Sequence, residues 1–151
     1  MLKLIPLLIA FLFLSPAAMA DNGLVSVKSS FDVSTTADRL EKKLKAKGMT
    51  VFSRINHAEG AAMVGKELRP TELVIFGNPK VGTPLMQCQQ TVAIDLPQKA
   101  LIWQDEDDQV WLTYNDPSYL ASRHHISACE EALKKVAGAL NKFANAATSP
   151  S

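Results

Sequence analysis

The sequence has few of the features that mark a known catalytic or nucleic-acid-binding function. Its 151 residues contain three histidines, two cysteines and seven glycines. They include neither a Gly-x-Ser-x-Gly elbow nor a P-loop, the phosphate-binding motif of many nucleotide hydrolases. Lys and Arg number 16 against 15 Asp and Glu. Since no basic stripe with interleaved aromatic residues occurs, we expect no nucleic-acid partner. The composition favours a binding or interaction module over an enzyme.

Metal ligands are equally sparse. His124 and His125 are adjacent, so their side chains diverge, and no third histidine is near them in the sequence. The acidic run at residues 105–108 lacks the spaced ligands and the glycine of a calcium loop. A metal-binding module using His124 or His125 is therefore our third hypothesis. We expect no metal and no cofactor.

The first 20 residues predict a secretory signal peptide. Lys3 supplies a positive charge, Leu4–Leu14 is apolar, and Ala18–Ala20 is a small-x-small cleavage site. The apolar run is short for a retained membrane helix, which is the weaker interpretation. No cysteine near the cleavage site could carry a lipid, so we expect no stable membrane anchor after cleavage. The predicted location is periplasmic or secreted, with cleavage after Ala20.

The remaining chain has the length of one domain. We assign residues 21–147 to a single domain with one core, and residues 148–151 to a disordered tail. Cys88 and Cys129 would enter an oxidising compartment together, which favours a disulfide between them. Two separate buried thiols are the alternative. A redox-active pair is disfavoured because no Cys-x-x-Cys spacing occurs.

Residues 69–86 predict a strand, a turn and a helix in close succession. The apolar block Leu73–Phe76 is of β type, and a Gly-Asn-Pro break follows it. Thr83 is a good N-cap, and Pro84 suits a first helical position, where its missing N–H is not needed. We therefore expect a helix to begin after Gly82.

Such a helix N-terminus would attract an anion. The amides after Gly82 would be free, and Lys80 would add positive charge. Asn78 and Thr83 complete the candidate site at this turn. The same residues are also explained by a tight connection at a sheet edge that binds nothing. Both interpretations stay open.

The other elements follow from periodicity and capping residues. Asp116 predicts the cap of a short helix, and Ser127–Glu130 reads as a capping box that opens a long C-terminal helix. Its end should fray from Ala147 onward. Residues 91–97 have no clear assignment. The expected strands are 24–30, 49–55, 99–104 and 109–114, and the expected helices lie after Thr35, over 58–66, over 85–89 and over 117–123.

A second cluster of chemically capable side chains follows the predicted hairpin. It contains Tyr114, Asn115, Asp116, Tyr119, Arg123, His124 and His125. Asp116 or His124 could transfer a proton if a cleft lay beside it. The candidate site joins this cluster to the first turn. Its residues are Asn78, Lys80, Gly82, Thr83, Tyr114, Asp116 and His124.

Several motifs resemble the family called domain of unknown function 302. The resemblance lies in the segments Glu67–Leu73, Phe76–Met86, Ile94–Pro97 and Tyr114–Pro117 of this chain. The resemblance implies an α+β fold: an antiparallel sheet of about four to five strands, helices packed on one face, β-α-β-β-β-β-α-like order and a long C-terminal helix. It implies no reaction. The cysteine pair is not part of the motifs that carry the resemblance.

The leading functional hypothesis is an exported, periplasmic ligand- or partner-binding module. Its partner would be a small molecule or a protein, and a homodimer is possible. The runner-up is an enzyme or anion-binding protein whose pocket joins the turn Asn78–Thr83 to the turn Tyr114–Asp116. In that case Lys80 and the backbone amides would hold the anion.

Overall fold

The computed structural model describes residues 22–150, so the predicted leader lies outside the described residues. An antiparallel sheet has the strand order β1-β5-β4-β3-β2. Its strands are β1 (Leu24–Lys28), β2 (Thr50–Asn56), β3 (Thr71–Gly77), β4 (Gln98–Gln104) and β5 (Val110–Asn115). The helices are α1 (Val33–Ala46), α2 (His57–Met63), α3 (Pro79–Cys88), the 3-10 helix η1 (Gln90–Ile94), α4 (Pro117–Arg123) and α5 (Glu130–Thr148). The predicted α+β class and long C-terminal helix are confirmed.

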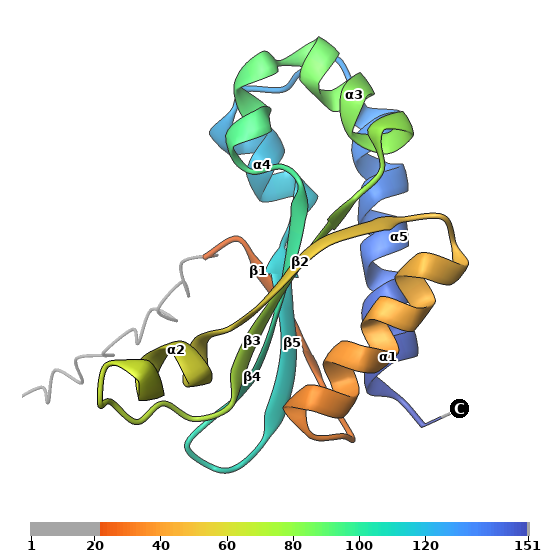
Figure 1. Ribbon diagram of the computed structural model, residues 1–151. Helices are drawn as coiled ribbons and strands as arrows, with labels where there is room; N and C mark the ends of the chain where they lie inside the picture. The colour runs from red at the N-terminus through yellow and green to blue at the C-terminus, as the bar shows by residue number, and fades with distance from the viewer. Residues whose placement is uncertain (1–21, 151) are drawn as a thin grey trace, which may run out of the picture.

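Helices α1 and α5 pack against each other and against one face of the sheet (Figure 1). The central strands β3, β4 and β5 turn alternate side chains toward these helices, and those side chains are buried. From α1, Leu40 and Leu44 close the same core at helical spacing. Helices α3, α4 and η1 gather at one end of the sheet, at the top of Figure 1. The molecule therefore has a body and a separate cap.

Helix α1 begins earlier than predicted. Asp32, not Thr35, is its N-cap, and the Asp32 carboxylate accepts a hydrogen bond from the Thr35 amide at 2.6 Å. Thr35 donates its hydroxyl to the same carboxylate at 3.0 Å. A carboxylate at the helix N-terminus also meets the positive end of the helix dipole. The prediction was wrong because Thr35 supports the cap instead of forming it.

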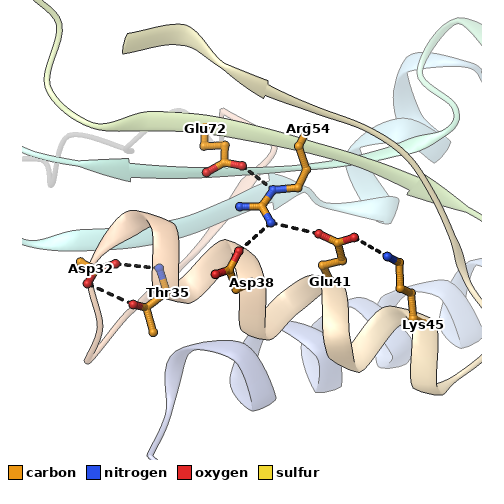
Figure 2. Close-up of polar contacts among 7 residues, drawn as sticks. All are labelled: Asp32, Thr35, Asp38, Glu41, Lys45, Arg54 and Glu72. Carbon is orange, nitrogen blue, oxygen red and sulfur yellow. Dashed lines mark hydrogen bonds and ion pairs between the residues drawn. The ribbon is translucent and has the colours of Figure 1, made fainter. Parts of the chain in front are cut away.

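An arginine of β2 joins α1 to the sheet. Figure 2 shows the Arg54 guanidinium held by Glu72 at 2.5 Å, Asp38 at 2.7 Å and Glu41 at 2.9 Å. Glu41 also pairs with Lys45 at 2.5 Å. These acids hold the pKa of Arg54 above its usual value, Glu72 contributing most. The ion pairs therefore link α1 to β2 and β3.

The start of α5 also differs from the prediction. Its N-cap is Cys129, whose side chain makes no capping hydrogen bond, so the capping box predicted from Ser127 does not form. The side chains at the helix N-terminus that meet its dipole are instead Glu130 and Glu131 in the first turn. The disulfide of Cys129, described below, fixes the entry of this helix.

The end of α5 is ordered where we predicted fraying. Ala147 and Thr148 are buried and helical, so the assignment of Thr148 to a disordered tail was wrong. Arg39 of α1 explains the difference. Its guanidinium donates to the carbonyl oxygens of Ala146, Ala147 and Ser149 at 2.6 to 3.2 Å, which satisfies acceptors that a helix C-terminus leaves unpaired.

Candidate functional site

Helix α3 starts at Pro79, four residues before the predicted cap. Asn78 is the N-cap, and its side-chain oxygen accepts from the Lys80 amide at 2.9 Å. The Gly82 amide already donates to the Asn78 carbonyl at 2.9 Å, so Thr83 is not a cap. Asn78 followed by Pro79 is a stronger start signal than Thr83 followed by Pro84. The anion site proposed for the amides after Gly82 loses its helix N-terminus, because those residues lie inside the helix.

The inner side of α3 borders an open cavity of about 240 Å³, which we call the α3 cavity. Its walls come from α3, from η1 with the segment after it, and from the ends of β2 and β3 that meet the cap. Asn78, Gly82 and Thr83 of the candidate site line it. Its other lining residues are largely apolar: Met49, Phe52, Gly77, Pro79, Val81, Leu85, Met86, Ala93, Leu96, Pro97, Gln98 and Val136.

The volume and lining fit a small apolar molecule. An apolar cavity of about 150 Å³ can hold benzene, so the larger α3 cavity has room for a molecule of one or two rings. Glycine contributes to this space. A Cβ placed on Gly82 would stand 3.8 Å from Leu96 Cδ1 and 3.9 Å from Met86 Cε. Those are ordinary contact distances, so a Cβ at position 82 fits beside the cavity wall, and a longer side chain there would compete with a ligand for the space.

The η1 wall is held to α4 by a buried histidine. His124 is only 8% exposed, and its Nε2 lies 2.5 Å from Asp95 Oδ2. Its Nδ1 lies 3.2 Å from the Thr91 hydroxyl. Because an ionised carboxylate only accepts, Nε2 donates the hydrogen bond to Asp95. Arg123 Nη1 approaches the same carboxylate at 3.4 Å.

This chain of Thr91, His124 and Asp95 has the order of a nucleophile, a base and an orienting carboxylate. However, neither Thr91 nor His124 lines the α3 cavity. We therefore assign the contact a positioning role. It fixes η1, whose Ala93 lines the cavity, against α4.

The far end of α3 is fixed covalently. Cys88, the last residue of α3, forms a disulfide with Cys129, the residue before α5. After η1, Lys99 donates its ammonium group to the carbonyl oxygens of Asp95 and Pro97 at 3.2 and 3.1 Å. Asn78 Nδ2 donates to the Gly48 carbonyl at 3.0 Å, which ties the start of α3 to the loop before β2. Both walls of the cavity are thus attached to the body at several points.

The residues of the second predicted turn have structural roles. Tyr114 is buried in the core, where burial raises the pKa of its hydroxyl. The Asp116 carboxylate caps α4 by accepting from the Ser118 amide at 2.8 Å, as predicted. Neither residue lines the α3 cavity, and Lys80 lines a different groove, beside the start of α5. The structure brings Asn78, Gly82 and Thr83 together and places His124 behind the η1 wall.

Most of the cavity lining was missed from the sequence. Met49, Phe52, Met86 and Leu96 carry no chemical signal, since an apolar side chain in a cavity looks the same in a sequence as one in a core. Asp95 belonged to a motif noted above, but its partner His124 is 29 positions away. Only the fold reveals that pairing.

The fold and the cavity together define a small α+β domain with one open sheet and a capped apolar pocket. A family model described as "Domain of unknown function DUF302" matches residues 25–143, and the chain belongs to that family. A crystal structure of an uncharacterized conserved protein DUF302 from Bacillus stearothermophilus has a TM-score of 0.76 with 20% identity. The match covers 83% of this chain and 98% of that one.

Two relatives are similar at the sequence level. Proteins named "Fluoride-specific ion channel FluC 1" from Brucella suis and from Brucella abortus are each 45% identical over 132 residues, which is 85% of this chain. The match spans about half of their length, 52% and 49%. Within residues 22–150, no helix combines the length and the apolar character needed to cross a membrane.

Proposed function

We propose that this protein is an exported module that binds a small apolar ligand in the α3 cavity. The observation that carries the proposal is the cavity itself: an open, largely apolar space of about 240 Å³ whose walls are attached by a disulfide and by the buried hydrogen bond between His124 and Asp95. Binding sites for small molecules are typically concave and mostly apolar, with a few polar groups that fix orientation. Asn78, Thr83 and Gln98 are the polar side chains in this lining.

Export to the periplasm or outside the cell is part of the proposal. The leader-like residues 1–20 support it, with the positive Lys3, the apolar run and the cleavage site after Ala20. The disulfide between Cys88 and Cys129 supports it independently, because such bonds persist in oxidising compartments. Detecting the mature chain, without residues 1–20, in a periplasmic or extracellular fraction would test it. An intact leader on cytosolic protein would contradict it.

Fluoride is a poor match for this cavity. The fluoride channel proteins carry that activity in their names as whole proteins, and only about half of their length corresponds to this chain. A small anion needs hydrogen-bond donors or cations, whereas most of the α3 cavity is hydrocarbon. Fluoride is nevertheless a useful probe, since strong stabilisation by sodium fluoride but not by an apolar ring would overturn the proposal.

The decisive experiment fills the cavity from position 82. Gly82→Leu places a side chain among Leu96 and Met86, and Gly138→Leu makes the same change in α5, where a Cβ meets nothing within 4 Å. Benzene and indole serve as probes in calorimetry and thermal denaturation. Wild type and Gly138→Leu should bind, and a probe at about 100 times its Kd should add roughly 2.7 kcal/mol of stability.

Gly82→Leu should lose at least about tenfold in affinity, which corresponds to roughly 1.4 kcal/mol. Replacing glycine within a helix favours the helix in both variants, so loss of folding does not explain the difference. Equal probe binding by both variants would contradict the proposed site, as would no binding of either probe to the wild-type protein.

A further inference from the structure

The face of the sheet turned away from α1 and α5 carries a band of large apolar side chains among polar ones. Strand register aligns Ile55, Leu73 and Leu101 across β2, β3 and β4, and it aligns Trp103 with Trp111 across β4 and β5. Together with Ile75 these residues form what we call the outer face. Ile55 is 39% exposed and the others are half-buried. Among residues 22–150, the helices that pack broadly on the sheet cover its other face.

The two tryptophans make the outer face suitable for close contact. Trp103 Nε1 donates to the Thr113 hydroxyl at 2.9 Å, and Trp111 Nε1 donates to the Asp105 carboxylate at 2.7 Å. Both indole N–H groups are therefore satisfied within the chain, and both rings are fixed in place. A rigid aromatic surface with its polar atoms already paired can be covered by a partner at little cost in entropy or hydrogen bonding.

Helix α2 extends the same surface. It begins at His57, directly after Asn56 ends β2, and none of its residues is buried. It projects from the sheet on the side away from α1 and α5 (left in Figure 1). Met63 is 87% exposed and Val64 is 72% exposed. We call residues 57–68 the α2 arm. Because this seven-residue helix buries no side chain, packing within its own chain stabilises it little, and a partner surface would stabilise it.

Charge on the outer face is arranged for a second copy of the same chain. The β4–β5 turn carries four acids at residues 105–108, opposed locally by Lys28 and Arg69, so this end is negative. Lys99 lies at the opposite end of β4 and on the outer face. If a two-fold axis runs across the strands, β4 of one copy is antiparallel to β4 of the other. Each Lys99 then lies toward the acidic turn of the partner copy.

We propose that the outer face and the α2 arm form a symmetric homodimer interface. The named residues lie on four strands, β2 to β5. Four strands spaced about 4.8 Å apart, each roughly 20 Å long, give a face of about 400 Å² in projection. The arm adds to it, toward the roughly 800 Å² per partner of a standard interface. Two such faces pack as in a β-sandwich, with apolar side chains between the sheets. The proposal does not depend on the α3 cavity, which lies at the cap.

Sedimentation equilibrium tests the proposal on the purified protein at about 1 to 100 µM, which covers the weak end of the affinities found for protein interfaces. The wild-type protein should be a dimer at the upper end. Leu101→Lys places a charge at the centre of the outer face and should weaken dimerisation at least tenfold. Ile94→Lys puts the same charge at an exposed position on η1, which is outside the face, and should leave the dimer intact.

A second pair of variants does not alter the packed surface. Asp107→Lys reverses a charge in the exposed turn, and Glu131→Lys reverses one on α5. Asp107→Lys should weaken the dimer several-fold at low salt and less at high salt, because screening reduces the attraction to Lys99 of the second copy. Glu131→Lys should have no effect.

Tryptophan fluorescence adds an independent measurement, since both tryptophans of the chain lie on the outer face. Quenching by acrylamide should decrease as the protein concentration rises through the dimerisation range. A wild-type protein that remains monomeric throughout would overturn the proposal. A dimer unaffected by both Leu101→Lys and Asp107→Lys would overturn it too, since the contact would then lie elsewhere.

Discussion

The body and the cap of this domain are held together by different physical means. In the body, α1, α5 and the sheet bury a continuous core that includes Leu40, Val74 and Ile102. In the cap, α3 and η1 each add one side chain to that core, Leu85 and Val92. They are otherwise attached at separate points: the disulfide, the contact of Asp95 with His124, and the hydrogen bond from Asn78 to the Gly48 carbonyl. Between those points an apolar space remains. A region held mainly by a few separate contacts can keep a cavity open, whereas a region held by close packing fills its own interior.

The comparison predicts that stability and ligand binding separate in variants of the two regions. Changes in the body should lower the free energy of unfolding without altering the affinity of the folded protein for an apolar probe. Changes in the cap should weaken binding even where stability falls little. The following variants test this separation, from the largest expected effect to the smallest.

Leu40→Ala should have the largest effect on stability. Leu40 is fully buried between α1 and the sheet, so truncation leaves a cavity and should cost about 2 to 5 kcal/mol. Urea denaturation measures the loss, and indole calorimetry at low temperature should give an unchanged Kd. Ile94→Ala, at an exposed position of η1 that does not line the cavity, should cost little. A large loss of indole affinity in folded Leu40→Ala would break the separation between body and cap.

Removing the disulfide should affect both quantities. Cys88 and Cys129 are 41 positions apart, for which the chain-entropy model gives about 4 kcal/mol. The double variant Cys88→Ser, Cys129→Ser should lose up to that amount, and its probe affinity should fall because the end of α3 is released. Wild-type protein in reductant should behave in the same way. Unchanged binding in both samples would mean that the disulfide does not position the cavity wall.

Asp95→Ala should act mainly on the cap. It leaves His124 Nε2 buried without its acceptor, which should cost about 1 to 3 kcal/mol. Indole affinity should fall several-fold, because η1 is no longer held against α4. Glu131→Ala, at an exposed position of α5, is the matched control and should change both quantities little. A loss of stability without any loss of affinity would show that η1 keeps its position by packing alone.

The smallest effect concerns the charges of Figure 2. Hydrogen bonds from Lys45 and Arg54 lower the pKa of Glu41 in the folded protein. The unfolded chain therefore binds protons at a higher pH than the folded one. The resulting stability is present above the usual pKa of a glutamate and is lost as the pH falls through the lowered value.

Because Lys45 is exposed, this contribution should be less than about 1 kcal/mol. Urea denaturation of the wild type and of Glu41→Gln between about pH 7 and pH 3 would measure it, and the variant should show the weaker dependence. An equally steep loss of stability in both proteins would assign the acid sensitivity to other carboxylates.

The body was largely predictable from the sequence, and the cap was not. Alternating strands and the Ala37, Leu40 and Leu44 spacing of α1 are local patterns that the core preserves. In the cap, two competing start signals stood five residues apart, and Asn78 with Pro79 prevailed over Thr83 with Pro84. Helix α3 therefore covers the turn at which we had expected free amides. The local signals were present, but their order of strength was misjudged.

The candidate site shows a second limit. Asn78, Gly82 and Thr83 were identified from turn chemistry, and they do line the cavity. Its apolar residues come from β2, η1 and α5 as well as α3, and no local pattern joins those segments. Tyr114 and Asp116 attracted attention as reactive side chains, but one is buried in the core and the other caps a helix. Reactivity alone does not distinguish a ligand site from a structural contact.

The central claim is that an apolar ligand enters the α3 cavity, and the methionine methyl groups test it most directly. Within residues 22–150, Met49 and Met86 line the cavity, and Met63 is exposed on the α2 arm. In a methyl NMR titration of ¹³C-methionine-labelled protein with indole, the signals of Met49 and Met86 should shift together and saturate, while that of Met63 stays in place. A titration that moves Met63 alone, or no methionine at all, would contradict the account.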